Sequence, residues 1–250
     1  MAGVTTVCTG WHPAAWGEYA RRFSETFNLH WSAEVHFVSF IELISYQETL
    51  ALLPRGHAAL LWDIPGAREF VERHKGIPAH CGAKGWRWDA LRWFKQCIIS
   101  HYVAQELDDG DILVWLDADV VTFADVPPAF VEGLLGDADL CYLGRRTHSE
   151  IGFWAVRLNA RSRWFLGELS ALYLDDRVFA LPETHSAYAF DVARVAAQQI
   201  RGLVARDLTP GGHGHVWLRS PLMPFLDHCK GKRKAIGHSP EHPLRWWTKR

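Results

Sequence analysis

The sequence predicts an α/β protein in which helices flank a mixed, mainly parallel β-sheet. Two observations lead to this prediction. The chain opens with a strand–helix–strand pattern, which is typical of the units that build parallel sheets. Further along, the near-continuous apolar run Ile112–Leu116 is typical of a strand that is buried on both faces of a sheet.

The elements of the first half follow from composition and spacing. Val4–Cys8 is short and β-branched, which predicts a first strand, and the partly alternating Glu34–Phe40 predicts a second. Between them, a helix is expected from Pro13, because apolar residues recur at helical spacing: Trp16, Tyr19, Ala20, Phe23 and Phe27. A long helix is predicted within Trp86–Leu107, which lacks Gly and Pro and has one apolar face: Ala90, Trp93, Phe94, Cys97 and Ile98.

The second half is less regular. Ala138–Gly144 and Gly152–Leu158 are predicted strands, and Arg161–Leu174 and Ala189–Ile200 are predicted helices. Thr209–Arg250 is rich in Gly, Pro and His and shows little periodicity, so an irregular C-terminal section is expected. Because no repeat and no flexible linker divides the chain, we expect a single domain over residues 1–250.

Composition narrows the function classes. The 27 Lys and Arg residues are balanced by 28 Asp and Glu, so the chain lacks the basic excess of a general nucleic-acid coat. The five cysteines are dispersed without a C-x-x-C pair, which predicts reduced thiols and a cytoplasmic location. No apolar run approaches the ~20 residues of a membrane span, so no transmembrane segment is expected.

Two carboxylates, Asp117 and Asp119, follow the predicted strand Ile112–Leu116. Open parallel sheets bind ligands at this end of their strands. Because residues two apart in an extended chain point the same way, both side chains can reach one ligand, and their hard oxygen atoms suit Mg²⁺ or Mn²⁺. These two residues by themselves leave three interpretations open: solvated strand ends, the nucleophile pair of a phosphatase, and a metal site.

The stretch "ILVWLDADVVTFADVP" resembles the D-x-D segment of GT-A-fold glycosyltransferases, which are Rossmann-like enzymes. A second stretch, "HCKGKRK" (His228–Lys234), resembles the H-x-x-G-x-x-K motif of the glycogenin-like and lipopolysaccharide galactosyltransferase-like group. The resemblance implies that the protein transfers a hexose from a nucleotide-diphosphate sugar, with UDP the expected nucleotide, and that the transfer retains the anomeric configuration. The acceptor is unknown and would be a glycan, a lipid-linked group or a protein. The resemblance also implies a nucleotide-binding half over residues 1–125 and an acceptor half over 126–250 that ends in a metal and diphosphate loop.

The same resemblance assigns candidate residues. Mn²⁺ or Mg²⁺ would be held by Asp117, Asp119 and His228. Donor-binding residues would be Arg92 and Lys95 on the helix before the D-x-D strand, Asp117 toward the ribose or sugar, Gly152, and the diphosphate-facing Lys230, Gly231 and Lys234. Candidate catalytic residues are Glu150, His185 and Asp191. Many relatives have an acidic residue in the loop that corresponds to Leu181–Asp191, but the centre of this segment is not acidic. The identity of the catalytic base therefore stays open.

Two other functions stay open. A haloacid-dehalogenase-type phosphatase would use Asp117 as its nucleophile and Asp119 as its acid and base. In such phosphatases, however, the strand that precedes the nucleophile usually lies near the start of the domain. A catalytically inactive sugar-nucleotide-binding protein is the non-enzymatic alternative. The loop histidines His213 and His215 lack the fixed spacing of a zinc site and are interpreted as loop residues.

Overall fold

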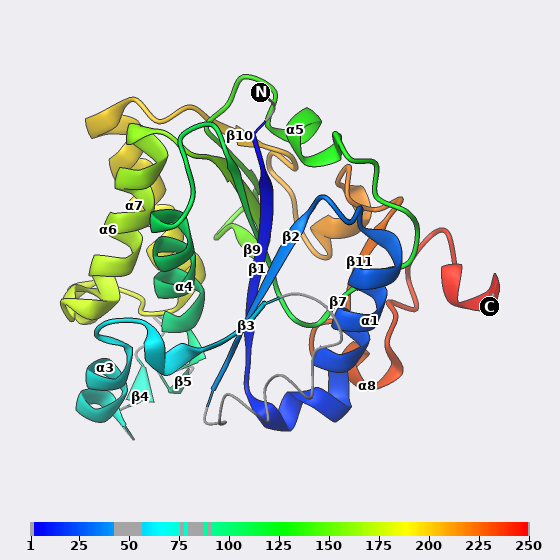
Figure 1. The fold of residues 1–250 in the computed structure, drawn as a ribbon, viewed down its shortest axis with the longest axis horizontal. Helices are drawn as coiled ribbons and strands as arrows, with labels where there is room; N and C mark the ends of the chain where they lie inside the picture. The colour runs from blue at the N-terminus through cyan, green and yellow to red at the C-terminus, as the bar shows by residue number, and fades with distance from the viewer. Residues whose placement is uncertain (1–2, 43–56, 76–77, 80–87, 90–91, 250) are drawn as a thin grey trace.

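The computed structural model describes residues 3–42, 57–75, 78–79, 88–89 and 92–249. Its centre is a seven-stranded sheet of order β10-β8-β9-β6-β1-β2-β3. Only β9 is antiparallel to its neighbours, β6 and β8, so the expected mixed, mainly parallel sheet is confirmed (Figure 1). The strands are β1 (Thr5–Trp11), β2 (His36–Ile41), β3 (His57–Leu60), β6 (Ile112–Leu116), β8 (Leu140–Leu143), β9 (Glu150–Arg157) and β10 (Ala205–Asp207).

Helices cover both faces of this sheet. One face is packed by α4 (Phe94–Gln105), α6 (Ala160–Leu174) and α7 (Ser186–Arg201), and the other by α1 (Arg21–His30) and α5 (Phe130–Leu135) (Figure 1). The short helix α3 (Ala67–His74) lies beyond β3. Among the described residues, no helix has both the length and the apolar character needed to cross a membrane.

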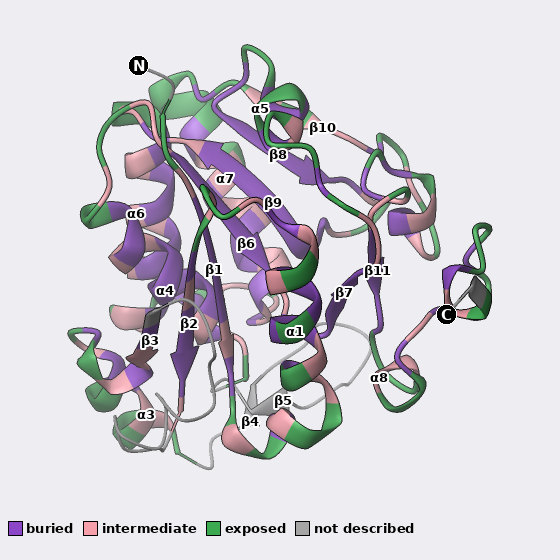
Figure 2. Ribbon diagram, turned by 45° about the vertical axis from the view of Figure 1, so that its right-hand side comes forward, coloured by how far each residue is buried: buried purple, intermediate pink, exposed green. Residues whose placement is uncertain are grey.

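The alternation of side chains along β6 explains its continuous apolar sequence. Leu113 and Trp115 enter the core under α4, α6 and α7, whereas Ile112, Val114 and Leu116 enter the core on the α1 side. All five residues of β6 are buried, and the central strands are buried along their length in Figure 2. A strand between two helical layers needs apolar residues on both faces, as the sequence predicts for this run.

Two helix predictions need correction. The helix expected within Trp86–Leu107 begins only at Phe94, because Trp88–Asp89 forms a short antiparallel pair (β5) with Pro78–Ala79 (β4). The helix expected from Pro13 starts as a 3₁₀ turn, Pro13–Ala15, passes through a π-helical turn, Trp16–Ala20, and becomes α-helical at Arg21. A π-turn is rare and often marks a functional site. The predicted face residue Ala90 lies outside the described residues.

The C-terminal section is tied to the sheet by a second, two-stranded sheet. In it β11 (Leu226–His228) pairs antiparallel with β7 (Val120–Thr122), and α8 (Arg233–Ile236) follows. The fully buried Asp227 accepts hydrogen bonds from Ser239 N (2.7 Å), Ser239 Oγ (2.5 Å) and Trp246 Nε1 (3.2 Å). This carboxylate therefore holds together the C-terminal section that the sequence predicts to be irregular.

A second buried carboxylate, Asp139, holds three elements together. It accepts hydrogen bonds from the Arg161 guanidinium (2.8 Å), Asn159 Nδ2 (2.7 Å) and Val204 N (2.9 Å), which lie at the start of α6 and before β10. Burial opposes ionisation, but these hydrogen bonds, with Arg161 first, lower the pKa of the Asp139 carboxyl from its ordinary value.

We expect Asp139→Asn to destabilise the fold by about 2 kcal/mol at neutral pH, because an amide replaces the charged acceptor of these bonds. A carboxyl whose folded pKa is lowered contributes stability that is present above its unfolded pKa of about 3.9 and is lost as pH falls through the folded pKa. Urea unfolding at several pH values measures this effect. The gap between wild type and variant should be full near pH 7 and shrink below about pH 4; a gap that is independent of pH would contradict it.

Candidate metal and diphosphate site

Asp117 and Asp119, which we call the acidic pair, lie between the end of β6 and the start of β7. Asp117 N donates to Gly152 O of β9 (2.9 Å), and Cys229 N donates to Asp119 O (3.0 Å). The β7–β11 register places Val120 opposite His228. Through these backbone bonds, three segments that are far apart in the sequence meet at the carboxyl edge of the parallel strands.

The side chains of Asp117, Asp119 and His228 converge at this edge; we call these three residues the acidic triad. His228 Nε2 lies 3.0 Å from Asp119 Oδ1 and 3.6 Å from Asp117 Oδ2. One ligand atom from each residue lies within 4.8 Å of the others. Asp119 and His228 are buried, whereas the Asp117 side chain is 34% exposed, so the triad is open to solvent on the Asp117 side.

The triad fits a divalent cation. In the described part of the chain, Asp119 Oδ1 and His228 Nε2 are both buried; they form an ion pair with each other, but neither makes a well-aligned hydrogen bond. Buried polar atoms without such a bond are costly unless a ligand satisfies them. Gly152 leaves the room that the triad needs, because a Cβ at that position would lie 2.7 Å from His228 Cε1 and 3.2 Å from Asp117 Oδ2. Two carboxylates and one imidazole are a donor set that suits Mn²⁺ or Mg²⁺.

Cations surround the triad. Lys234 Nζ lies 3.3 Å from Asp119 Oδ2, and Lys230 Nζ lies 3.8 Å from Glu150 Oε1. Glu150 is only 2% exposed, pairs with Arg145 through its other oxygen, and lies 3.7 Å from His228 Nδ1. The positively charged loop predicted around Gly231 thus lies directly against the acidic pair.

These charges set the protonation of the triad. Partial burial raises the pKa of the Asp117 carboxyl, and Asp119 raises it further. Burial also opposes the ionisation of Asp119, but His228 and Lys234 overcome it and lower the pKa of that carboxyl far below its usual range. For His228, burial favours the neutral ring, yet Asp119 and then Glu150 raise its pKa. Asp119 is therefore an anion held by cations, and a metal ion would compete with a proton on His228.

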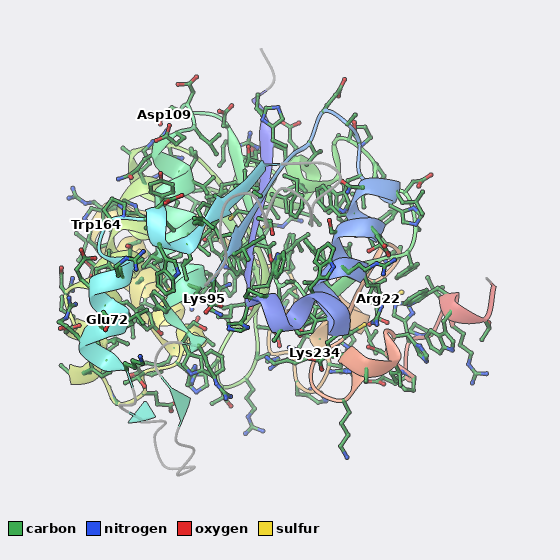
Figure 3. The ribbon with its side chains drawn as sticks, turned by 60° about the horizontal axis from the view of Figure 1, so that its bottom comes forward. Arg22, Glu72, Lys95, Asp109, Trp164 and Lys234 are labelled. Atoms are coloured by element: carbon green, nitrogen blue, oxygen red, sulfur yellow. The ribbon has the colours of Figure 1, made fainter. Side chains whose placement is uncertain are left out.

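Two residues of the N-terminal segment hold Lys234 in place, and the sequence reasoning missed this role for both. The Lys234 ammonium lies 4.0 Å from the ring centroid of Tyr19, which belongs to the π-helical turn. The Arg22 guanidinium donates to Lys234 O (3.0 Å). Figure 3 shows Arg22 and Lys234 close together beside α1 and α8. The sequence predicts Tyr19 only as a residue on the apolar face of the helix expected from Pro13. No local sequence pattern predicts a contact between opposite ends of the chain.

Other predicted site residues lie in different surroundings. Lys95, on α4, forms an ion pair with Glu42 at the end of β2. Arg92 precedes α4 instead of lying on it. His185 caps the N-terminus of α7 and Asp191 accepts two hydrogen bonds from Ser149. A catalytic or donor-binding role for these four residues stays a prediction.

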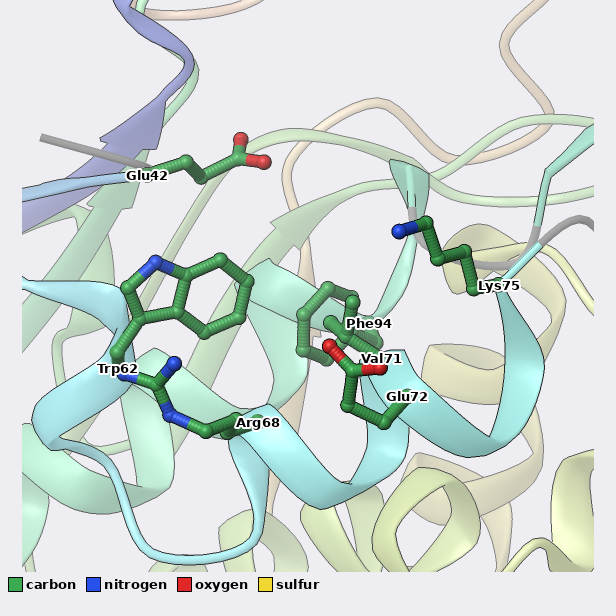
Figure 4. A pocket seen from close by; sticks show the side chains of 7 residues that line it. All are labelled: Glu42, Trp62, Arg68, Val71, Glu72, Lys75 and Phe94. Carbon is green, nitrogen blue, oxygen red and sulfur yellow. The ribbon is translucent and has the colours of Figure 1, made fainter.

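A pocket of about 280 Å³ opens at the same edge of the sheet. It lies beyond β2 and β3 and is lined by Glu42, Trp62, Arg68, Val71, Glu72, Lys75 and Phe94 (Figure 4). The Arg68 guanidinium lies over the Trp62 ring, 5.6 Å from its centroid.

The sheet and its acidic carboxyl edge define the GT-A architecture that the sequence motifs predict. No family model matches the sequence, and no curated protein matches it. Mouse xyloside xylosyltransferase 1 in its apo form has a similar structure, with a TM-score of 0.51 and 11% identity over 82% of this chain and 84% of that chain. This similarity confirms the GT-A-type fold of the chain.

Two further solved structures are similar at lower scores. An active-site mutant of LgtC has a TM-score of 0.48 and 13% identity over 76% of this chain and 70% of that chain. The glycosyltransferase GlyE of Streptococcus pneumoniae also has a TM-score of 0.48, with 11% identity over 98% of this chain and 60% of that chain.

Proposed function

We propose that this protein is a metal-dependent glycosyltransferase that transfers a sugar from a nucleotide diphosphate to an acceptor. One observation carries the proposal. Two carboxylates from the turn between β6 and β7 and a buried imidazole from β11 converge at the carboxyl edge of a GT-A-type sheet, with Lys234 beside Asp119 and Lys230 beside Glu150. By analogy, the similar structure of a xylosyltransferase supports this class of reaction, although the site and not the fold carries the argument.

The chemistry of the donor explains this combination of charges. A nucleotide diphosphate leaves readily only when its developing negative charge is neutralised. Asp117, Asp119 and His228 would hold Mn²⁺ or Mg²⁺, and the bound ion would supply that neutralisation. Lys230 and Lys234 add fixed positive charge beside the ion, and Gly231, with φ of +66°, lets the backbone of the loop turn close to a phosphate.

Finer features of the reaction extend this proposal. We propose a UDP-sugar as donor and retention of configuration, both on the H-x-x-G-x-x-K motif at His228–Lys234. Glu150 would act as a positioning residue: its carboxylate is buried between Arg145 and Lys230 and lies beside the His228 ring. In a retaining reaction the leaving diphosphate can itself accept the proton of the acceptor, so a separate base is not required.

The alternatives make different demands on the same residues. A phosphatase needs Asp117 as an ionised nucleophile, whereas here burial and then the neighbouring Asp119 raise the pKa of Asp117, which disfavours the ionised form. A phosphatase also has no need of the buried His228 next to Asp119. An inactive sugar-nucleotide-binding protein would keep the whole site, so only the formation of a glycosylated product separates it from the enzyme.

Thermal unfolding with a panel of nucleotide sugars, each with and without Mn²⁺, tests the proposal. A ligand that binds only the folded state at 100 times its dissociation constant stabilises it by about 2.7 kcal/mol. We expect UDP-sugars to raise the midpoint, and more with Mn²⁺ than without. If no nucleotide sugar shifts the midpoint in the presence of Mn²⁺, the proposal fails. Release of free UDP with a glycan or glycolipid acceptor then separates the enzyme from the binding protein.

Tyr19→Leu is expected to weaken donor binding in the presence of Mn²⁺ about fivefold, because the cation–π contact with Lys234 contributes about 1 kcal/mol to the position of that ammonium. Tyr19→Phe keeps the ring and should bind the donor like wild type. Titration calorimetry with a UDP-sugar measures both variants. Equal affinities of the Leu and Phe variants would show that the ring does not position Lys234.

A further inference from the structure

A second cluster of metal-binding side chains lies outside the acidic triad. His148, in the loop between β8 and β9, lies beside Glu183 and His185, which precede α7. We propose that His148, Glu183 and His185 form a binding site for a divalent ion of the zinc class; we call it the His-Glu-His site. This inference goes beyond the proposed function, because no step of sugar transfer uses such an ion.

The distances suit a shared ion. His185 Nε2 and His148 Nε2 lie 2.7 Å and 3.1 Å from the same carboxylate oxygen, Glu183 Oε2. One ligand atom from each of the three residues lies within 4.8 Å of the others. Zinc ligands lie about 2.0–2.1 Å from the ion, so tetrahedral neighbours are about 3.4 Å apart. The two distances from Glu183 Oε2 to the imidazole nitrogen atoms therefore need to lengthen by less than about 1 Å to admit an ion.

The two ligand segments are held in position by α7 and α6. His185 is the N-cap residue of α7, and the carbonyl of the buried Thr184 accepts a hydrogen bond from Tyr173 OH (2.8 Å). Next to His148, Ser149 donates through its backbone amide (2.9 Å) and its hydroxyl (2.6 Å) to Asp191 of α7. The side chains are therefore preorganised, which lowers the entropic cost of binding an ion.

The donor atoms separate this site from the acidic triad. Two imidazoles and one carboxylate form a set that zinc prefers, whereas the two carboxylates and one imidazole of the triad suit Mn²⁺ or Mg²⁺. The side chains of His148, Glu183 and His185 are 25%, 25% and 14% exposed, so an ion can enter from solvent. Three protein ligands leave a fourth position for water or another molecule.

Binding would also change the tautomer of His185. In the structure its Nδ1 accepts a hydrogen bond from Tyr188 N (3.2 Å), so the ring proton of the neutral form sits on Nε2, facing Glu183. An ion on Nε2 moves this proton to Nδ1. Because Nδ1–H and Tyr188 N–H would then be two donors facing each other, the His185 ring must turn away from Tyr188 N, which keeps its bond to His185 O (3.1 Å). The switch of tautomer is thus a signature of zinc on this residue.

The test uses Zn²⁺ alone, with the full chain carrying Asp119→Ala so that the acidic triad is disabled. Equilibrium dialysis at micromolar Zn²⁺ should give one tightly bound ion per chain. Adding His148→Ala or Glu183→Gln should weaken that binding about 100-fold or more, since loss of a ligand exceeds the 10–100-fold cost of losing an outer partner. His213→Ala, an exposed loop histidine, is the matched control and should leave binding unchanged.

Absence of tight Zn²⁺ binding in the Asp119→Ala chain would overturn the proposal, as would equal binding after His148→Ala and after His213→Ala. Glu183→Gln keeps the size of the side chain, so it remains informative if His148→Ala unfolds the chain. Nitrogen-15 NMR of the histidine rings supplies an independent measurement: the proton of His185 should move from Nε2 to Nδ1 when Zn²⁺ is added, and an unchanged tautomer contradicts ligation. None of these measurements needs a nucleotide sugar, so failure here is distinct from failure of the proposed function.

Discussion

Asp119→Ala is expected to lower kcat/KM for sugar transfer by about 10³-fold, which corresponds to about 4 kcal/mol of transition-state stabilisation. The substitution removes one of the three residues that would hold the ion, and with it the neutralisation of the leaving diphosphate. It also leaves His228 and Lys234, which lie 3.0 Å and 3.3 Å from this carboxylate, without their anionic partner. Donor affinity should lose its dependence on Mn²⁺. Initial rates and donor titrations with and without Mn²⁺ measure both effects.

Asp137→Ala is the matched control for this variant, because Asp137 is exposed in the loop that precedes β8. It should have wild-type activity and a wild-type response to Mn²⁺. If Asp119→Ala retained donor binding that still depends on Mn²⁺, Asp119 would not be a ligand of the ion, and the acidic triad would not be the metal site.

Gly152→Ala is expected to weaken Mn²⁺ binding about 100-fold without unfolding the protein. The added methyl group would lie 2.7 Å from His228 Cε1 and 3.2 Å from Asp117 Oδ2, so at least one of these side chains must move. His228 has little room to retreat, because it is 1% exposed and its ring packs 4.9 Å from that of Trp217. Overpacking of this kind also costs about 1–3 kcal/mol of stability. Titration with Mn²⁺ and urea unfolding measure the two effects separately.

Gly133→Ala adds the same methyl group in α5, where it would meet no described atom within 4 Å. It should leave Mn²⁺ binding unchanged and not lower stability, because Ala is a better helix former than Gly. Wild-type Mn²⁺ affinity in Gly152→Ala would mean that the triad does not need the space that this glycine leaves.

The edge of the sheet that forms the site could be predicted from local patterns. The buried run Ile112–Leu116 predicts a central strand, and Asp117 and Asp119 then lie at its carboxyl end whatever the rest of the chain does. The prediction of His228 as a metal ligand rests instead on the resemblance of His228–Lys234 to a family motif. The position of His228 opposite Val120 depends on the pairing of β7 with β11, which no periodicity in residues 209–250 indicates.

The surroundings of Glu150 and Tyr19 could not be predicted from local sequence patterns. The sequence predicts Glu150 only as a candidate catalytic residue; the structure adds that its carboxylate is buried beside His228 and pairs with Arg145 and Lys230. Tyr19 follows helical spacing as expected, yet a π-helical turn brings its ring under Lys234. Spacing predicts which face of a helix a residue occupies; it does not predict which distant segment packs on that face.

By itself the sequence determined the class of the sheet, the position of its central strand and the two carboxylates that end this strand, because strand burial and side-chain alternation are local properties of a few residues. Only the tertiary structure decided which residues surround those carboxylates. His228 and Lys234 reach them through β11 and α8, Glu150 through β9, and Tyr19 through the N-terminal turn. Contacts between such distant segments depend on strand pairing and on the packing of buried charge against opposite charge. Neither can be predicted from the spacing of residues within any one segment.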